Sequence, residues 1–255
     1  MIEVEKLSKR FRLTRKQKRE MGLKGDSPYI WPVKEISFTC RPGRVFTLLG
    51  PNGAGKTTTL RLIATMLKPT EGTIRVAGYD TRQEPRKVRS SIGFLTGTTG
   101  LYGRLTADEI VRYYADLNSI DRDTFEKNRK HLFDLLDIHP FANRRIAKLS
   151  TGMRQKVSIA RTMIHDPEVV VFDEPTTGLD VITARAIIEL IRRCRQDGKT
   201  VIFSTHIMGE VNLLSDDLAI IHEGRLLFNG PFADFRDQCQ SRTIEDEFIR
   251  LVQEA

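Results

Sequence analysis

The segment 50–58 reads GPNGAGKTT and fits the phosphate-loop pattern G-x-x-x-x-G-K-[ST]. The apolar run 45–49 before it is typical of a buried strand, and residues 58–67 after it are compatible with a helix. A strand, a loop and a helix in this order are the context that the pattern requires, so a nucleotide is the first candidate ligand. The alternative, a glycine-rich turn with a solvated lysine, fits this context less well.

Each residue type in the loop has a physical role in holding phosphate. The glycines open backbone conformations that other residues avoid, so successive N–H groups can converge on phosphate oxygens. The helix adds its positive N-terminal end, Lys56 can reach the β- and γ-phosphates, and the Thr57 hydroxyl can ligate Mg²⁺. The candidate ATP-binding residues are Gly50, Pro51, Asn52, Gly53, Ala54, Gly55, Lys56, Thr57 and Thr58.

A pair of carboxylates follows a second apolar run. Residues 169–172 read VVVF and lead directly into Asp173 and Glu174, which places both at the carboxyl end of a strand, where doubly wound sheets bind ligands. Asp173 suits an outer-sphere Mg²⁺ role, and Glu174 suits polarising the attacking water. An acidic turn after a core strand is the alternative, and the phosphate loop upstream makes it the weaker one.

A third strand is expected over residues 200–205, and His206 stands at its end. A lone histidine is more often structural than catalytic. Its place at the end of a strand, after another strand–helix unit, favours a contact with the γ-phosphate.

Between these segments, residues 149–153 read LSTGM. With the phosphate loop, the Asp–Glu pair and His206 in this order, the chain resembles the nucleotide-binding subunits of ATP-binding-cassette (ABC) transporters over nearly its whole length. LSTGM takes the place of the family's LSGGQ signature, and 175–180 (PTTGLD) matches its D-loop region. The phrases 91–97, 100–106 and 150–157 resemble the NatA-like branch, whose members serve sodium or drug export with a separate membrane subunit.

The resemblance implies an α/β fold: a P-loop NTPase of the ABC type with an antiparallel β-subdomain and a helical subdomain. It also implies ATP hydrolysis with Mg²⁺ in a head-to-tail dimer of two cassettes, which drives the membrane permease of an exporter. Each ATP would lie between one phosphate loop and the partner's signature, and a D-loop residue would lie nearby. The residues concerned are Ser150, Thr151, Gly152, Met153 and Asp180. The permease is expected to dock on the 97–105 loop and the start of the helical subdomain.

Two positions depart from the family pattern. Gly97 stands where most cassettes have a Mg²⁺-contacting glutamine, and glycine has no ligating side chain. Water or a hydroxyl of Thr96, Thr98 or Thr99 could complete the metal shell instead. In the signature, Met153 replaces glutamine, while the hydroxyl of Ser150 and the close backbone approach at glycine remain, and these are what a phosphate contact chiefly needs.

A chain of 255 residues fits one ABC ATPase domain over residues 1–255. We expect a β-rich core over about 1–97 and 161–230, a helical subdomain over about 98–160 and a helical tail over about 231–255. Antiparallel strands are expected at 2–7 and 33–40, helices at 107–117 and 124–136, and a signature helix from Ser150. A helical pattern over 232–252 has apolar positions that we expect to pack on the domain, namely Ile244, Phe248, Ile249 and Leu251.

The segment 9–24 carries eight lysines and arginines against one glutamate and supplies most of the net charge of +8. It can be a solvated hairpin, the commonest fate of charge runs, or it can contact anionic lipid or nucleic acid. Two aromatic residues lie near the place where the family's adenine-stacking ring falls, Phe11 and Trp31. A core role is the alternative for either ring.

No apolar run reaches the roughly 18 residues of a membrane span, and residues 1–5 do not resemble a signal peptide. We therefore expect the cytoplasmic face of the membrane, reached through the permease and shared with a second ABC subunit, identical or different. The three cysteines lack metal-ligand spacing, so free thiols are expected. The rival functions are a soluble cassette ATPase acting on nucleic acid or ribosomes, and a regulatory subunit that binds ATP with little turnover.

Overall fold

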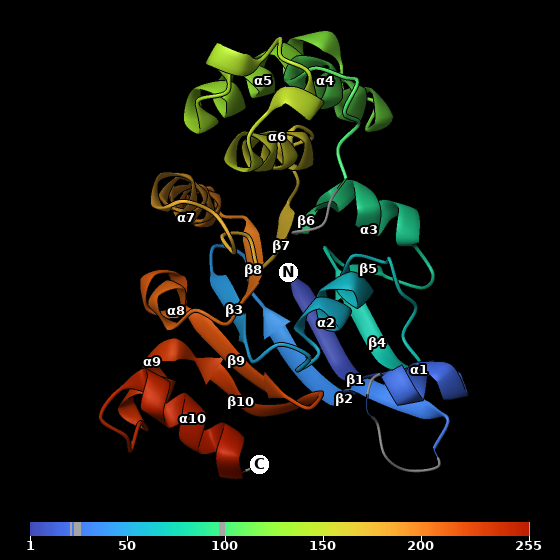
Figure 1. Ribbon diagram of the computed structural model, residues 1–255, viewed down its shortest axis with the longest axis vertical. Coiled ribbons are helices and arrows are strands. Elements are labelled where there is room, and N and C mark those ends of the chain that lie inside the picture. Colours follow the sequence, from blue (N-terminus) through green and yellow to red (C-terminus); the bar gives the residue numbers. More distant parts are fainter. Residues whose placement is uncertain (21, 23–26, 97–99, 255) are drawn as a thin grey trace.

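In the computed structural model, which describes residues 1–20, 22, 27–96 and 100–254, the strands form two sheets (Figure 1). The larger has the order β10-β9-β3-β8-β7-β6 and is parallel except for the β9–β10 pair. Its strands are β3 (Val45–Leu49), β6 (Ile92–Thr96), β7 (Val169–Asp173), β8 (Thr200–Thr205), β9 (Asp217–His222) and β10 (Arg225–Pro231). The smaller sheet is antiparallel, in the order β2-β1-β4-β5, with β1 (Ile2–Arg12), β2 (Tyr29–Cys40), β4 (Glu71–Val76) and β5 (Tyr79–Asp80).

The central strands of the larger sheet are buried at every position because both faces of the sheet are covered. Side chains alternate between two hydrophobic clusters along β7. Val169 and Val171 join the cluster that includes β1, β2 and β4, whereas Val170 and Phe172 join the cluster built on the helices. This double cover explains why these strands read as continuous apolar runs.

Figure 1 shows three helices gathered at one end of the molecule, away from the smaller sheet: α4 (Ala107–Leu117), α5 (Arg122–Leu136) and α6 (Thr151–Met163). A capping box between Thr106 and Glu109 begins α4, and Asp121 caps α5 by accepting from the Thr124 N–H. Two short 3₁₀ turns, His139–Phe141 and Ile146–Lys148, connect α5 to α6. The other helices before the C-terminal region are α1 (Arg15–Glu20), α2 (Lys56–Ile63), α3 (Pro85–Ser91), α7 (Val181–Gln196) and α8 (Met208–Leu214).

The expected α/β fold with an antiparallel sheet and a group of helices is confirmed. The helix predicted at 107–117 has these bounds, and the one predicted at 124–136 begins two residues earlier. The helix after the phosphate loop begins at Lys56 and ends at Ile63, before the predicted end at 67. Thr65 has a positive φ of 59°, which breaks the helical path there. None of the described helices is both long and apolar enough to cross a membrane.

The C-terminal region departs from the single helical pattern expected over 232–252. It forms two helices, α9 (Phe232–Asp237) and α10 (Ile244–Glu254). The buried Glu247 carboxylate holds the connection by accepting hydrogen bonds from the Gln240 and Ser241 N–H groups at 3.2 and 3.1 Å. Three of the four expected apolar contacts form, but Ile249 is 46% exposed, so its predicted packing was wrong.

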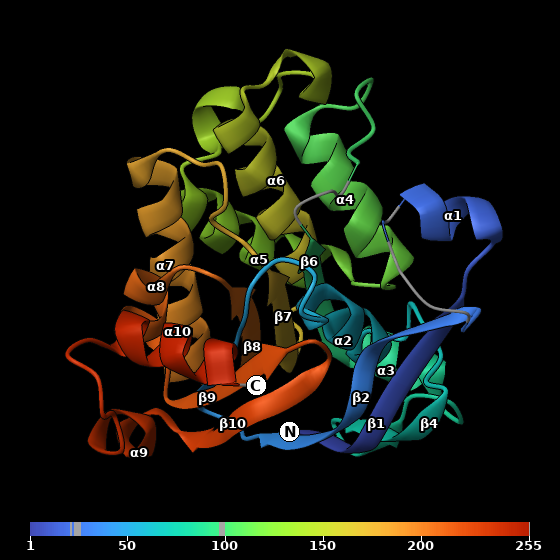
Figure 2. The same ribbon diagram turned by 60° about the horizontal axis from the view of Figure 1, so that its bottom comes forward.

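The basic segment forms more regular structure than a charge run indicates. Strand β1 continues to Arg12, and α1 follows it, which the sequence pattern did not predict. Figure 2 shows α1 at the edge of the molecule, beyond the end of the β1–β2 pair. Lys16, Arg19 and Glu20 are exposed, and Lys16 and Glu20 form a loose ion pair at 3.8 Å.

Candidate functional site

The phosphate loop leaves the carboxyl end of β3 and enters α2, as predicted. Gly55 precedes the helix with φ 112°, a conformation that residues with a Cβ rarely adopt. A Cβ at this position would lie 2.2 Å from the Pro32 carbonyl oxygen. The loop therefore needs glycine here both for its conformation and for its contact with β2. A cleft over the loop is lined by most of the predicted ATP-binding residues, together with Pro32 and Glu174.

Lys56 lies beneath this loop, and its side chain is buried. Its ammonium group donates to the carbonyl oxygens of Gly50 at 2.6 Å and Pro51 at 3.1 Å. The same nitrogen lies 3.2 Å from Glu174 Oε1. The lysine charge is thus fixed at the floor of the cleft, where it can attract a phosphate.

The two predicted carboxylates have different partners, although they are adjacent in the chain. Asp173 Oδ1 accepts from the hydroxyls of Thr57 at 3.0 Å and Ser204 at 2.8 Å. Glu174 Oε1 lies between Lys56 and His206, with His206 Nδ1 at 3.4 Å. Asp173 is therefore tied to the helix side of the phosphate loop, and Glu174 to its lysine.

Glu174 also has an unusual backbone, with φ 47°. Non-glycine residues pay a conformational cost in this region, and such residues gather at functional sites. Burial acts to raise the pKa of its carboxyl, but hydrogen bonds and charges from Lys56 and His206 outweigh it and lower that pKa. The carboxylate is consequently ionised at neutral pH and is available as a base.

The donor set fits a magnesium ion bound together with phosphate. Thr57 Oγ1 offers an oxygen ligand, and Asp173 Oδ1 lies 3.0 Å from it, where it can accept from metal-bound water in the expected outer-sphere role. Mg²⁺ commonly takes one or two protein oxygens and completes its shell with phosphates and water. No group of three or more His, Cys, Asp or Glu side chains suited to a metal occurs among the described residues. The residues therefore fit a shared metal–nucleotide site and not a metal cage made of protein alone.

The residues of the LSTGM signature lie at a different place, where α6 and α7 begin. Ser150 caps α6 by accepting from the Met153 N–H at 3.2 Å, and Asp180 caps α7 by accepting from the Thr183 N–H at 2.9 Å. A Cβ at Gly152 would lie 2.9 Å from Thr183 Oγ1 and 3.4 Å from Asp180 Oδ2. Two helix N-termini, which favour anions, thus stand side by side. None of the four signature residues lines the described part of the phosphate cleft.

The two candidate adenine-stacking rings have different neighbours on the β1–β2 arm. The Lys9 ammonium lies 5.0 Å from the centre of the Phe11 ring. The Arg10 guanidinium lies 5.7 Å from the Trp31 ring and 4.7 Å from the Tyr29 ring. Lys9 and Arg10 are consecutive strand residues and therefore point to opposite faces of the β1–β2 pair. The Phe11 ring beside Lys9 and the Trp31 ring beside Arg10 accordingly lie on opposite faces. Only one of them can therefore face a bound nucleotide.

Some predictions concern residues outside the described part of the chain. Gly97, which replaces the family's glutamine, and the alternative donors Thr98 and Thr99 lie there. Thr96 is described and pairs with Asp173 across β6 and β7, so its place beside the carboxylate is compatible with the role considered for it.

Sequence reasoning missed several residues that complete the site. Ser204 joins the ends of two strands, because its hydroxyl donates to Asp173 and accepts from the Glu174 N–H at 3.1 Å. Pro32 reaches the phosphate cleft from a distant strand, and no local pattern marks it. Ser204 could have been noticed from its position next to Thr205 and His206, at the end of a predicted strand.

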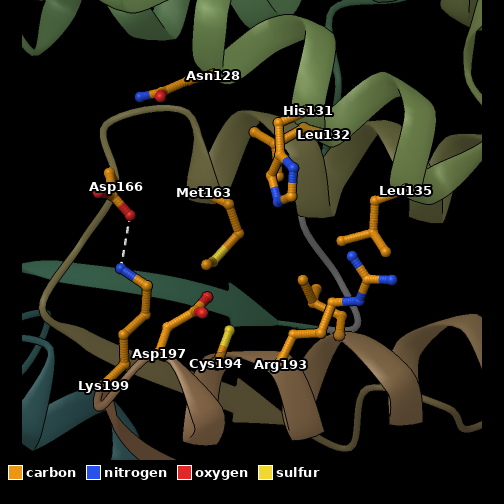
Figure 3. A pocket seen from close by; sticks show the side chains of 11 residues that line it. Asn128, His131, Leu132, Leu135, Met163, Asp166, Arg193, Cys194, Asp197 and Lys199 are labelled. Atoms are coloured by element: carbon orange, nitrogen blue, oxygen red, sulfur yellow. Dashed lines mark hydrogen bonds and ion pairs between the residues drawn. The ribbon is translucent and has the colours of Figure 1, made fainter.

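A separate cavity lies between α5, α6 and α7 (Figure 3). The sulfur atoms of Met163 and Cys194 and the ring of His131 point into it, and Asp166 pairs with Lys199 at 2.6 Å on its rim. Burial raises the pKa of the Cys194 thiol to about 12, so this thiol is unreactive at neutral pH. All three cysteines are free thiols.

Comparison with known proteins gives consistent matches in sequence. The ABC transporter family model matches residues 33–177. The ABC transporter ATP-binding protein NatA of Bacillus subtilis is 41% identical over 218 residues, 85% of this chain and 89% of NatA. The linearmycin resistance ATP-binding protein LnrL of the same species is 32% identical over 88% of this chain and 72% of LnrL.

Solved structures match as well. A structure of the ATP-binding subunit of an ABC transporter superposes with a TM-score of 0.85 at 26% identity, covering 98% of this chain and 99% of that chain. A dimeric ATP-binding cassette in a post-hydrolysis state, bound to ADP and Pi, superposes with a TM-score of 0.78 at 25% identity. It covers 91% of this chain and 98% of that chain.

Proposed function

This chain belongs to the ABC transporter family as an ATP-binding and ATP-hydrolysing subunit of the NatA-like branch, and we propose how its residues perform this work. The observation that carries the proposal is the contact of Glu174 with both Lys56 and His206 beside the phosphate loop. At one edge of the sheet, Lys56 would thereby serve as the cation for phosphate, Glu174 as the base and His206 as a second phosphate contact.

In the proposed mechanism, the N–H groups of residues 50–58 and the Lys56 ammonium hold the phosphates of ATP. Thr57, with Asp173 in the outer shell, would hold Mg²⁺, which would neutralise phosphate charge when bound. Glu174 accepts a proton from the attacking water, and His206 donates a hydrogen bond to the γ-phosphate. The ionised state of Glu174 at neutral pH supports its role as the base.

We further propose that a second ABC subunit completes the site. Ser150, Thr151, Gly152 and Met153 of one subunit would contact the ATP held by the other, with Asp180 at the junction. Next to Asp180, the side chains of Val181 and Ile182 are 84% and 81% exposed, although both are apolar. Exposed apolar residues beside two helix N-termini support a partner surface at this place.

The membrane partner is proposed to be a separate permease, which would keep this chain at the cytoplasmic face of the membrane. Its docking surface would include the groove formed by residues 102–105 with Tyr113 of α4. Tyr102 and Tyr113 are 59% and 41% exposed and meet edge to face, with ring centroids 6.0 Å apart. Exposed aromatic residues of this kind favour a protein interface. We also propose that α4, α5 and α6 form the helical subdomain expected over about 98–160, with α6 extending to Met163.

For the basic segment 9–24 we propose contact with anionic lipid beside the permease. The exposed cations Lys16 and Arg19 of α1 and the cation–aromatic pairs of the neighbouring strands support a headgroup contact. A solvated hairpin without a ligand is the alternative.

The experiment that tests the proposed function measures ATP hydrolysis by the purified chain as a function of its own concentration. Because a composite site forms only on dimerisation, activity per chain should rise with protein concentration. Sedimentation velocity in ATP, run in parallel, should show dimer over the same range. Activity per chain that stays constant while only monomer sediments would contradict the composite site, and absence of hydrolysis at all concentrations would contradict the enzymatic role.

A further inference from the structure

Glu210, in the first turn of α8, is a buried carboxylate to which the mechanism above gives no role. The residue is only 6% exposed, and its carboxylate forms no ion pair with the described cations. Burying a carboxylate without a cation is costly unless hydrogen bonds replace water. Its surroundings must therefore supply donors to both oxygens.

These donors are two buried threonines. Thr176 donates its hydroxyl to Oε1, and Thr205 donates to Oε2 at 2.6 Å. Thr205 Oγ1 in turn accepts from the Ile207 N–H at 3.0 Å. The threonines are 7% and 2% exposed, so water cannot readily replace Glu210 as their acceptor.

The two threonines lie beside Glu174 and His206, Thr176 in the loop after β7 and Thr205 as the last residue of β8. Thr176 lies two residues after Glu174, and Thr205 directly precedes His206. The parallel ladder between β7 and β8 ends at the pair Asp173–Ser204. Beyond this pair the Glu174 N–H bonds to the Ser204 carbonyl and hydroxyl oxygens at 3.2 and 3.1 Å. Glu210 adds a side-chain link between the Thr176 loop and the end of β8.

We propose that Glu210 is a positioning residue for ATP hydrolysis, which fixes the Glu174 loop against the His206 loop through Thr176 and Thr205. The inference rests on the roles proposed for Glu174 and His206. Those two side chains lie 3.4 Å apart, a separation that the backbone of either loop alone does not determine. A displacement of about 1 Å in such a site can lower the rate by about 100-fold.

The first test compares Glu210→Ala with Glu210→Gln. Alanine removes both acceptors, whereas glutamine has the same shape and keeps one acceptor oxygen. We expect Glu210→Ala to lower kcat about tenfold or more, with KM for ATP changed less than about threefold, and Glu210→Gln to recover much of kcat. Glu247→Ala is the matched control, because it removes another buried glutamate that accepts from a hydroxyl, that of Ser241, far along the chain in α10. It should lower Tm and leave kcat unchanged.

The second test is a double-mutant cycle with His206→Ala. If Glu210 acts through the two loops, its substitution should reduce kcat much less in the His206→Ala background than in the wild type. Equal factors in the two backgrounds, or a Glu210→Ala variant with wild-type kcat, would overturn the proposal. The activity of the wild-type protein, measured in the same series, separates the role of Glu210 from the proposed function. An inactive wild type would overturn the proposed function itself.

Discussion

The phosphate-loop edge of the larger sheet and the starts of α6 and α7 differ in how many partners this chain itself supplies to their polar side chains. At the phosphate-loop edge, Asp173 accepts from Thr57 of the loop, and Glu174 pairs with Lys56. The side chains of Lys56 and Asp173 are buried. At the starts of α6 and α7, Ser150 and Asp180 are exposed, and among the described residues each bonds to its own helix. The first region is organised before any ligand arrives, whereas the second is a surface that offers two helix ends to solvent.

The difference matches a division of labour between binding and completing a site. Fixed donors and charges inside one chain can hold a nucleotide without a partner. Exposed helix ends attract an anion strongly only when another molecule covers them and removes water, because water weakens electrostatic interactions. Loss of the phosphate-holding cation in the first region should therefore abolish binding, loss of the base there should stop turnover, and substitutions in the second region should affect only turnover in the assembled protein.

The largest effect is expected from Lys56→Ala, which removes the only buried ammonium that lines the described phosphate cleft. Titration with a fluorescent ATP analogue should show loss of nucleotide binding, because Glu174 then faces the phosphates without a compensating charge. Lys199→Ala is the matched control, since it removes another largely buried, ion-paired lysine at the separate cavity. Wild-type affinity in Lys56→Ala would contradict the organisation of the first region.

The next effect is expected from Glu174→Gln, which keeps the shape of the side chain but removes its basicity. Turnover should fall by about 10³-fold while ATP binding persists, because a positioned base contributes about 10²- to 10⁴-fold. Size-exclusion chromatography with ATP should show an accumulated dimer. Turnover like that of the wild type would remove Glu174 from the proposed mechanism.

Ser150→Ala tests the second region directly. It should lower ATPase activity about tenfold at a fixed protein concentration, since a single charge-assisted hydrogen bond is worth about 1.5–3 kcal/mol, and leave ATP binding to the monomer unchanged. The substitution also removes a helix cap, so Asp121→Ala, which removes the corresponding cap of α5, is the control for stability. If Ser150→Ala weakened ATP binding to the monomer, the two regions would not be separable as described.

Substitution of the basic segment should have the smallest effect. In this variant, Gln replaces four residues, namely Arg15, Lys16, Lys18 and Arg19. Sedimentation with acidic vesicles at low salt should weaken by about 1 kcal/mol per charge at most, with ATP binding unchanged.

The control for this variant replaces exposed cations of α5, namely Arg122, Lys127 and Lys130. If sedimentation of the α1 variant with acidic vesicles were unchanged, the lipid contact would be wrong, and the alternative of a solvated hairpin without a ligand would remain. Reduced binding to mixed-sequence nucleic acid across a salt series, in place of reduced vesicle binding, would favour the nucleic-acid function instead.

The parts of the fold that the sequence predicted are those with strong local signals. Strands β3, β7 and β8 are buried on both faces and read as continuous apolar runs, and the phosphate loop lies between two of the expected elements. The family resemblance then placed Asp173, Glu174 and His206 near one another. Their proximity follows from parallel strands, whose carboxyl ends share one edge of the sheet.

The parts that the sequence did not predict depend on contacts between distant residues. The break in the C-terminal helix is held by Glu247, whose carboxylate accepts from residues six and seven positions before it. Glu210 joins Thr176, which precedes it by 34 residues, and no periodicity marks such a pair. The role of Pro32 in the cleft likewise exists only once β2 has been placed beside the phosphate loop.

The tight packing at Gly152 affects how inherited or selected variants of this chain should be interpreted. Even the single methyl group of an alanine would press on the Thr183 hydroxyl, so the bond of this hydroxyl to Asp180 at the start of α7 would be disturbed before any neighbouring subunit sensed the change. A loss-of-function phenotype at this codon would therefore mix a folding defect with a signalling defect. In a genetic screen, changes at Ser150 would report the proposed contact between subunits once the loss of the α6 cap has been accounted for.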